Sequence, residues 1–166
     1  TVQPDNETVL MNREIKSRTL QDFNNMLSGH PEIKLINMKE VPGSNDDEIN
    51  FQVGVRLRQN GINIHILDNG FIASGGVDLL LAGVQRTRGT NTRIGVHSWS
   101  DGNGNEATDF PVNSSEHLPN IQYYEKVGYT AQWSRGFYFF TINAASADNI
   151  HWMTEAEITQ YSMLTQ

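Results

Sequence analysis

Two residues of this 166-residue sequence have the type and position for nucleophilic catalysis. Ser74 follows the short apolar segment 71–73, an expected strand, and begins a segment to Ala82 that is typical of a helix. His97 directly follows another expected strand, 93–96. A neutral imidazole within hydrogen-bond reach of a serine can take its proton. Each residue also has a structural interpretation, because serine often caps helices and histidine is often only a hydrogen-bonded structural residue.

A third feature that could take part in catalysis is the turn Pro42-Gly43-Ser44. Together with the backbone N–H of Gly75, the N–H groups of Gly43 and Ser44 could bind the oxyanion that forms when a carbonyl is attacked. Losing one such donor typically lowers the rate roughly 10²–10³-fold. Pro-Gly turns are also common as simple loops.

Strand and helix patterns alternate along the chain and predict an α/β fold. Repeated strand-helix units imply a mostly parallel sheet with right-handed crossovers. Parallel sheets gather ligand sites at the carboxyl ends of their strands, which is where Ser74 and His97 fall. The expected strands are 8–11, 33–38, 62–67, 71–73 and 93–96, with a turn at 68–70. The expected helices are 17–27, 45–60 with Asn45 as N-cap, 74–82, two within 115–145 broken near Gly128, and one begun by the capping box at Thr154.

Taken together, these motifs resemble the Clp protease family in order and approximate spacing. The resemblance rests on Pro42-Gly43-Ser44, Ala73-Ser74-Gly75-Gly76, Gly95-Val96-His97 and the closing segment 153–161. The Ala-Ser-Gly-Gly turn is also similar to that of bacterial signal peptide peptidases. The resemblance implies one domain, residues 1–166, of the Clp protease/crotonase-like fold, with a mostly parallel sheet and a C-terminal helical region.

The resemblance further implies a Ser-His-Asp triad, with Ser74 as nucleophile and His97 as base and then acid. The family's acid lies a few residues before the closing turn, and Asp148 occupies the corresponding place. Asp109 and Glu106, in the loop after His97, are competitors for this role. The family usually has two glycines before the serine of the oxyanion turn, whereas here only Gly43 precedes Ser44. Which of Gly43 and Ser44 donates its N–H is therefore open.

Composition restricts the partners. The net charge of −7 argues against nucleic acid and against an anionic membrane surface, and no apolar stretch is long enough for a membrane span. There are no cysteines, so thiolate metal sites and disulfides are excluded. Residues 101–109 have calcium-loop spacing but lack the glycine at loop position 6, where Glu106 stands, and the acid at position 12, where Val112 stands. We therefore expect no metal and no cofactor.

The aromatic density between Trp133 and Trp152 has two interpretations, an oligomer interface and core packing. The family resemblance implies a homo-oligomer, a trimer or hexamer, for which Phe137 and Tyr138 are candidate interface residues. The start of the sequence has no signal-peptide pattern. The protein is then periplasmic or secreted if a signal segment was removed, with a cytoplasmic location as the alternative.

Three functions are compatible with these residues. The first is an ATP-independent peptidase or other acyl hydrolase acting on a peptide or acyl substrate. The second is a crotonase-like acyl-CoA enzyme that stabilises a thioester enolate, which the Ser/His pair disfavours. The third is a non-catalytic relative that binds a partner, because fold alone does not set function.

Overall fold

A computed structural model describes all 166 residues, which form one six-stranded sheet and its covering helices. Strands run in the spatial order β1-β2-β3-β5-β6, with β4 also paired to β3; every pair is parallel except β5 with β6. The strands are β1 (Thr8–Met11), β2 (Leu35–Val41), β3 (Asn63–Ala73), β4 (Arg86–Arg88), β5 (Arg93–Val96) and β6 (His151–Trp152). The α-helices are α1 (Thr19–Gly29), α2 (Asp47–Gln59), α3 (Gly75–Ala82), α4 (Leu118–Lys126), α5 (Ala131–Ala144) and α6 (Glu155–Gln160).

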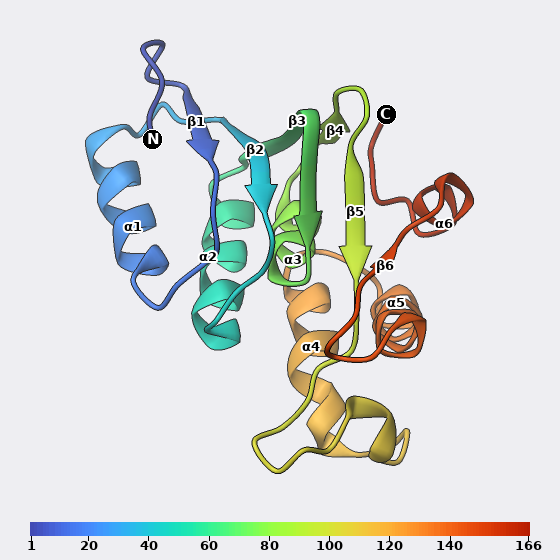
Figure 1. Cartoon of the computed structure of the whole chain (residues 1–166). Helices are drawn as coiled ribbons and strands as arrows, with labels where there is room; N and C mark the ends of the chain where they lie inside the picture. The colour runs from blue at the N-terminus through green and yellow to red at the C-terminus, as the bar shows by residue number, and fades with distance from the viewer.

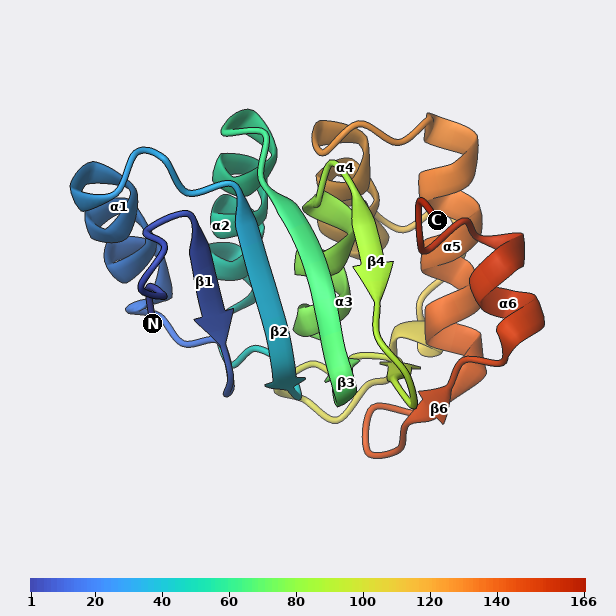
Figure 2. The same cartoon turned by 90° about the horizontal axis from the view of Figure 1, so that it is seen from above.

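Helices α1 to α4 lie on one side of the sheet, and α5 and α6 flank its β5–β6 end (Figures 1 and 2). The chain therefore progresses across the sheet, and its N- and C-termini lie at opposite ends (Figure 1). The arrangement is an α/β fold with a mostly parallel sheet and a C-terminal helical region, as predicted.

The buried core lies between the sheet and α3. All eight residues of α3 are buried, which agrees with its nearly continuous apolar sequence. Alternate residues of β3, such as Ile64 and Ile66, point into this core, while Asn63 and His65 between them are partly exposed. Because α3 is enclosed on every side, its first turn is held rigidly against the ends of β3 and β5.

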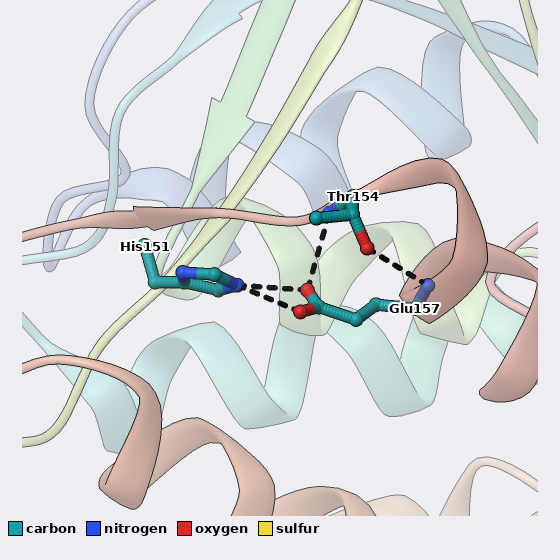
Figure 3. A network of polar contacts seen from close by, with 3 residues as sticks. All are labelled: His151, Thr154 and Glu157. Atoms are coloured by element: carbon teal, nitrogen blue, oxygen red, sulfur yellow. Dashed lines mark hydrogen bonds and ion pairs between the residues drawn. The ribbon is translucent and has the colours of Figure 1, made fainter.

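Helix ends follow the sequence signals in most places. The Thr130 side chain caps α5 through the N–H of Trp133, and Gly128, with φ of 108°, separates α4 from α5. At α6 the predicted capping box is present: Thr154 accepts from the N–H of Glu157, and the Glu157 carboxylate accepts from the N–H of Thr154 (Figure 3). The α2 cap was predicted one residue early, because the side chain that accepts from Ile49 is that of Asp46 and not Asn45.

The predicted turn at 68–70 is wrong, because β3 continues through it as one strand to Ala73. Asn69 takes a φ of 59°, and the pairing of β2 with β3 shifts register between Met38 and Glu40. A turn-forming sequence is thus accommodated as a local irregularity within paired strands. Strands β4 and β6 were not predicted, since each has only two or three residues and depends on pairing with distant segments.

Phe137 and Tyr138 belong to the core and not to a free surface. Their exposed fractions are 0% and 1%, and both stack or pack edge-on against neighbouring rings of the helical region. The prediction that these two residues form an oligomer interface is therefore wrong, and the competing interpretation as core is confirmed.

No helix has the length and apolar character needed to cross a membrane.

Candidate active site

Ser74 has an unusual backbone conformation at the junction of β3 and α3. Its φ is 52° and its ψ is −120°, a region that non-glycine residues rarely occupy. Its side chain makes no capping hydrogen bond, although Ser74 stands at the N-cap position of α3. The simple helix-cap interpretation of Ser74 therefore fails. A serine held in a strained strand-to-helix turn is the arrangement that exposes a nucleophilic hydroxyl.

The end of β5 holds the Ser74 backbone in place. Ala73 pairs with Gly95, and the N–H of Ser74 donates to the carbonyl of Gly95 at 3.1 Å. Two residues further on, His97 leaves the sheet on the same edge. Ser74 and His97 are both partly buried and line the same pocket, whose volume is about 250 Å³. No hydrogen bond joins them in this structure, a common situation before substrate binds.

The His97 ring has a defined tautomer. Its Nδ1 lies 2.6 Å from the carbonyl oxygen of Ser98. A carbonyl can only accept, so Nδ1 carries the proton and Nε2 of the neutral ring is free to accept one. This is the protonation state that a general base requires.

The turn 42–44 lies directly beside Ser74. A Cβ atom on Gly43 would be 3.5 Å from the Cβ of Ser74 and 3.8 Å from its Oγ. The N–H groups of Gly43 and Ser44 make no hydrogen bond within the protein, whereas the Gly43 carbonyl accepts from Ile15. Two unpaired backbone donors therefore stand next to the serine side chain.

Gly75 packs too closely against its neighbours to carry a side chain. A Cβ there would lie 2.7 Å from the Cβ of Ser44 and 2.9 Å from the Nδ2 of Asn50. Its N–H is in the first turn of α3, where helical N–H groups have no intrahelical partner. Gly43 thus lies close to Ser74, and Gly75 lies close to Ser44.

Asp148 is not hydrogen-bonded to His97. It stands exposed in the turn between α5 and β6, and the ring nitrogen that it would orient is bonded to Ser98 instead. Its competitors are also engaged elsewhere: Glu106 accepts from the N–H of Ala147, and Asp109 accepts from the N–H of Glu106. The role of Asp148 as the orienting acid stays a prediction.

The oxygen atoms of Asp101, in the loop with calcium-like spacing, accept hydrogen bonds from the same loop. One carboxylate oxygen of Asp101 accepts from the N–H groups of Asn103 and Asn105, and the other accepts from the Asn105 side chain. The Asp101 carboxylate therefore organises a surface turn. No group of three or more histidine and acidic side chains in the structure is arranged to hold a metal ion.

Sequence reasoning missed three polar residues around the site. Asn50, fully buried on α2, donates to the carbonyl of Gly75 at 3.0 Å and so fixes the first turn of α3. Asp47, at the start of α2, and Asp78, on α3, both line the pocket.

The two pocket carboxyls have perturbed acidity. Burial raises the pKa of Asp78 to about 7; the hydroxyl of Tyr124, which donates to it at 2.8 Å, works in the opposite direction, and nearby Asp47 raises it further. Desolvation and the neighbouring Asp46 raise the pKa of Asp47, while the proximity of His97 lowers it. A pocket that holds such groups beside a nucleophile is typical of a functional site.

Solved structures similar to this chain include proteases. No protein-family model matches the sequence, and no curated protein matches it. A membrane-bound stomatin-specific protease, 1510-N, matches with a TM-score of 0.60 at 18% identity, covering 95% of this chain and 76% of that one. ClpP1 from Listeria monocytogenes matches with a TM-score of 0.61 at 18% identity, covering 96% and 90%. The ClpP catalytic domain from Plasmodium falciparum matches with a TM-score of 0.59 at 17% identity, covering 97% and 84%. The chain therefore has a Clp protease-like fold.

Proposed function

We propose that this protein is a serine hydrolase, and specifically an ATP-independent peptidase, with Ser74 as nucleophile and His97 as general base. The observation that carries the proposal is the strained, uncapped Ser74 in a pocket shared with a histidine whose Nε2 is free. A strained residue persists only where its surroundings hold it, and such residues cluster at active sites.

The proposed chemistry follows the positions of these groups. The Ser74 oxygen attacks the substrate carbonyl, and its proton passes to Nε2 of His97. The N–H groups around Ser74, from Gly43, Ser44 and Gly75, receive the negative charge on the former carbonyl oxygen. His97 then gives its proton to the leaving amine, and water hydrolyses the acyl-enzyme by the same steps.

The similar solved structures support the peptidase over its rivals, since they include proteases and one of them holds a substrate peptide. No observation in this structure favours the crotonase-like alternative. We also propose a homo-oligomer and a periplasmic or secreted location, both of which rest on the sequence. Any interface has to use residues other than Phe137 and Tyr138.

A serine-reactive probe tests the nucleophile directly. We expect a fluorophosphonate to add one equivalent to the wild-type chain, seen by intact mass, and none to Ser74→Ala. Ser100→Ala is the matched control, because Ser100 lines the same pocket but has ordinary backbone conformation. Full labelling of Ser74→Ala, or loss of labelling in Ser100→Ala alone, would contradict the assignment.

A further inference from the structure

The pocket beside Ser74 is acidic and contains no matching cation. Asp47 and Asp78 both line it, and neither lysine nor arginine does. Its only basic side chain is that of His97, which the proposed chemistry uses. A buried carboxylate is stabilised by a cation or by several hydrogen bonds, whereas buried Asp78 has only the one hydrogen bond from Tyr124.

Asp78 is the more deeply buried of the two carboxyl side chains that line this pocket. It stands in α3, four positions after Ser74, the N-cap residue of that helix. Its exposed fraction is only 8%. One carboxyl oxygen accepts from Tyr124 at 2.8 Å, and the other has no hydrogen-bond partner in the protein. This second oxygen belongs to a nine-tenths buried side chain that lines the cavity next to the nucleophile.

Part of the pocket lining is apolar. Val77, Tyr124, Phe137 and Ile142 all line the pocket. Long cationic side chains bury their methylene stems along apolar surface while the charged head reaches a polar partner. The pocket thus combines apolar side chains with the carboxyl group of Asp78, and Asp47 adds a second carboxyl group to its lining.

We propose that this pocket selects substrates with a linear cationic side chain, as in lysine or arginine, next to the bond that Ser74 cleaves, and that Asp78 binds the charged end of that side chain. The inference rests on the proposed hydrolase function, whose site it shares. It assigns Asp78 as the specificity-determining residue and Asp47 as a weaker contributor.

The acidity of the two carboxyls agrees with this assignment. The pKa of Asp78, raised to about 7 by burial, means that the empty pocket disfavours its charged form. A bound ammonium or guanidinium group lowers that pKa again, because an opposite charge nearby favours the carboxylate. The charged group that acts on Asp78 is Asp47 from α2, and the hydroxyl of Tyr124 from α4 donates to it. His97, at the end of β5, acts on Asp47.

The first experiment compares peptides that differ only in this side chain. Fluorogenic peptides with lysine or its uncharged analogue norleucine before the scissile bond are assayed with wild type, Asp78→Asn and Asp22→Asn, an exposed α1 control. We expect wild type to prefer lysine, and Asp78→Asn to lower the lysine-to-norleucine ratio of kcat/KM roughly 30-fold. Asp22→Asn should leave that ratio unchanged. Equal rates for both peptides with wild type would overturn the inference.

A second experiment needs neither turnover nor a variant. n-Butylamine mimics the lysyl side chain and n-pentanol is its neutral counterpart. We expect n-butylamine to slow fluorophosphonate labelling of wild-type Ser74 far more than n-pentanol at the same concentration. Equal protection by both would overturn the inference and leave the proposed nucleophile standing.

The two proposals fail differently. If Ser74 is never labelled, the proposed hydrolase function fails, and binding of n-butylamine to the Ser74→Ala protein, measured by calorimetry, decides the cation site separately. Binding of n-butylamine that Asp78→Asn weakens would support the cation site. Absence of that binding, or an unchanged affinity in Asp78→Asn, would overturn it.

Discussion

His97 and His151 come from neighbouring strands but have opposite surroundings. His151 pairs with Val96, the residue directly before His97, in the antiparallel ladder of β5 and β6. Its Nε2 lies 2.8 Å from the carboxylate of Glu157, which also completes the α6 capping box (Figure 3). His97 has no carboxylate partner. Its Nδ1 bonds to a backbone carbonyl, and it shares a pocket with Ser74.

This contrast shows that a histidine-carboxylate pair is not by itself a catalytic signature. The His151–Glu157 pair has the contact expected within a triad, yet neither residue lines the pocket of Ser74. The His97 site lacks that contact but has Ser74 in its strained backbone conformation, the free Nε2 and the N–H groups of the turn 42–44. A main-chain carbonyl is sufficient to hold the tautomer.

Substituting the two histidines separately gives the largest expected effect. We expect His97→Gln to lower kcat by about 10⁴-fold or more, because base and nucleophile act as one unit. His151→Gln should change kcat by less than about threefold, since it touches neither Ser74 nor its donors. Steady-state peptidase kinetics measure both, and circular dichroism checks that each variant is folded. Equal losses of kcat in the two variants would contradict the prediction that only His97 takes part in catalysis.

Asp148→Asn sharpens the same comparison. If the Ser98 carbonyl alone orients His97, this variant should retain kcat within about tenfold. Replacing a triad aspartate by asparagine typically lowers kcat about 10⁴-fold. A loss of kcat of that size in Asp148→Asn would show that Asp148 reaches His97 during catalysis. In that case the predicted acid is correct, and the loop 145–149 changes position on substrate binding.

Much of the fold could be predicted because its signals are local. The apolar run of α3, the capping box at Thr154 and the break at Gly128 each depend on a few adjacent residues. The missed features depend on distant partners. Strand β6 exists because His151 and Trp152 meet β5, and the turn sequence at 68–70 stays in β3 because strands pair on both sides of it.

Some features of the candidate site could also be predicted from the sequence, whereas others could not. Ser74, His97 and the turn at Gly43 could be proposed from strand ends, since parallel strands place their ends together. The positive φ of Ser74 depends on the strands and turn packed around it, and no local pattern encodes it. The contact of the His97 ring with the carbonyl of the next residue is local, but the residue types do not predict it. Asp47 and Asp78 look like ordinary helix residues in the sequence, and only packing turns them into the lining of one pocket.

The Asp78 carboxyl should produce the next largest effect, on stability. Its pKa is about 7 in the folded protein against 3.8 for an ordinary aspartate, so the native state binds more protons between these values. Raising the pH through this window therefore lowers the free energy of unfolding, and the loss is complete above about pH 7. Asp78→Asn has no such loss. Relative to wild type it should gain on the order of a few kcal/mol between pH 4 and pH 8.

Urea unfolding at several pH values measures this difference. Asp47, His97 and other titrating groups are present in both proteins, so their contributions largely cancel in the comparison. Parallel stability curves for wild type and Asp78→Asn would show that the carboxyl stays ionised in the fold, and would remove the support that its acidity gives to the cation site.

The smallest expected effect concerns the α6 cap, the structural counterpart of the His97 site. Glu157→Gln removes the negative charge that faces both His151 and the N–H of Thr154. We expect it to lower the free energy of unfolding by about 1 kcal/mol, the usual value of a helix cap, which lowers Tm by roughly 2–4 °C in a chain of this size. Thr154→Ala, which removes the reciprocal bond, is the matched variant and should lower the free energy of unfolding by the same amount.

Because neither Glu157 nor Thr154 lines the pocket, kcat of the folded protein should be unchanged in both variants. A loss of activity larger than the loss of stability would mean that the capping box also positions His97 through the β5–β6 pairing, and the two histidine regions would then have to be treated as one site.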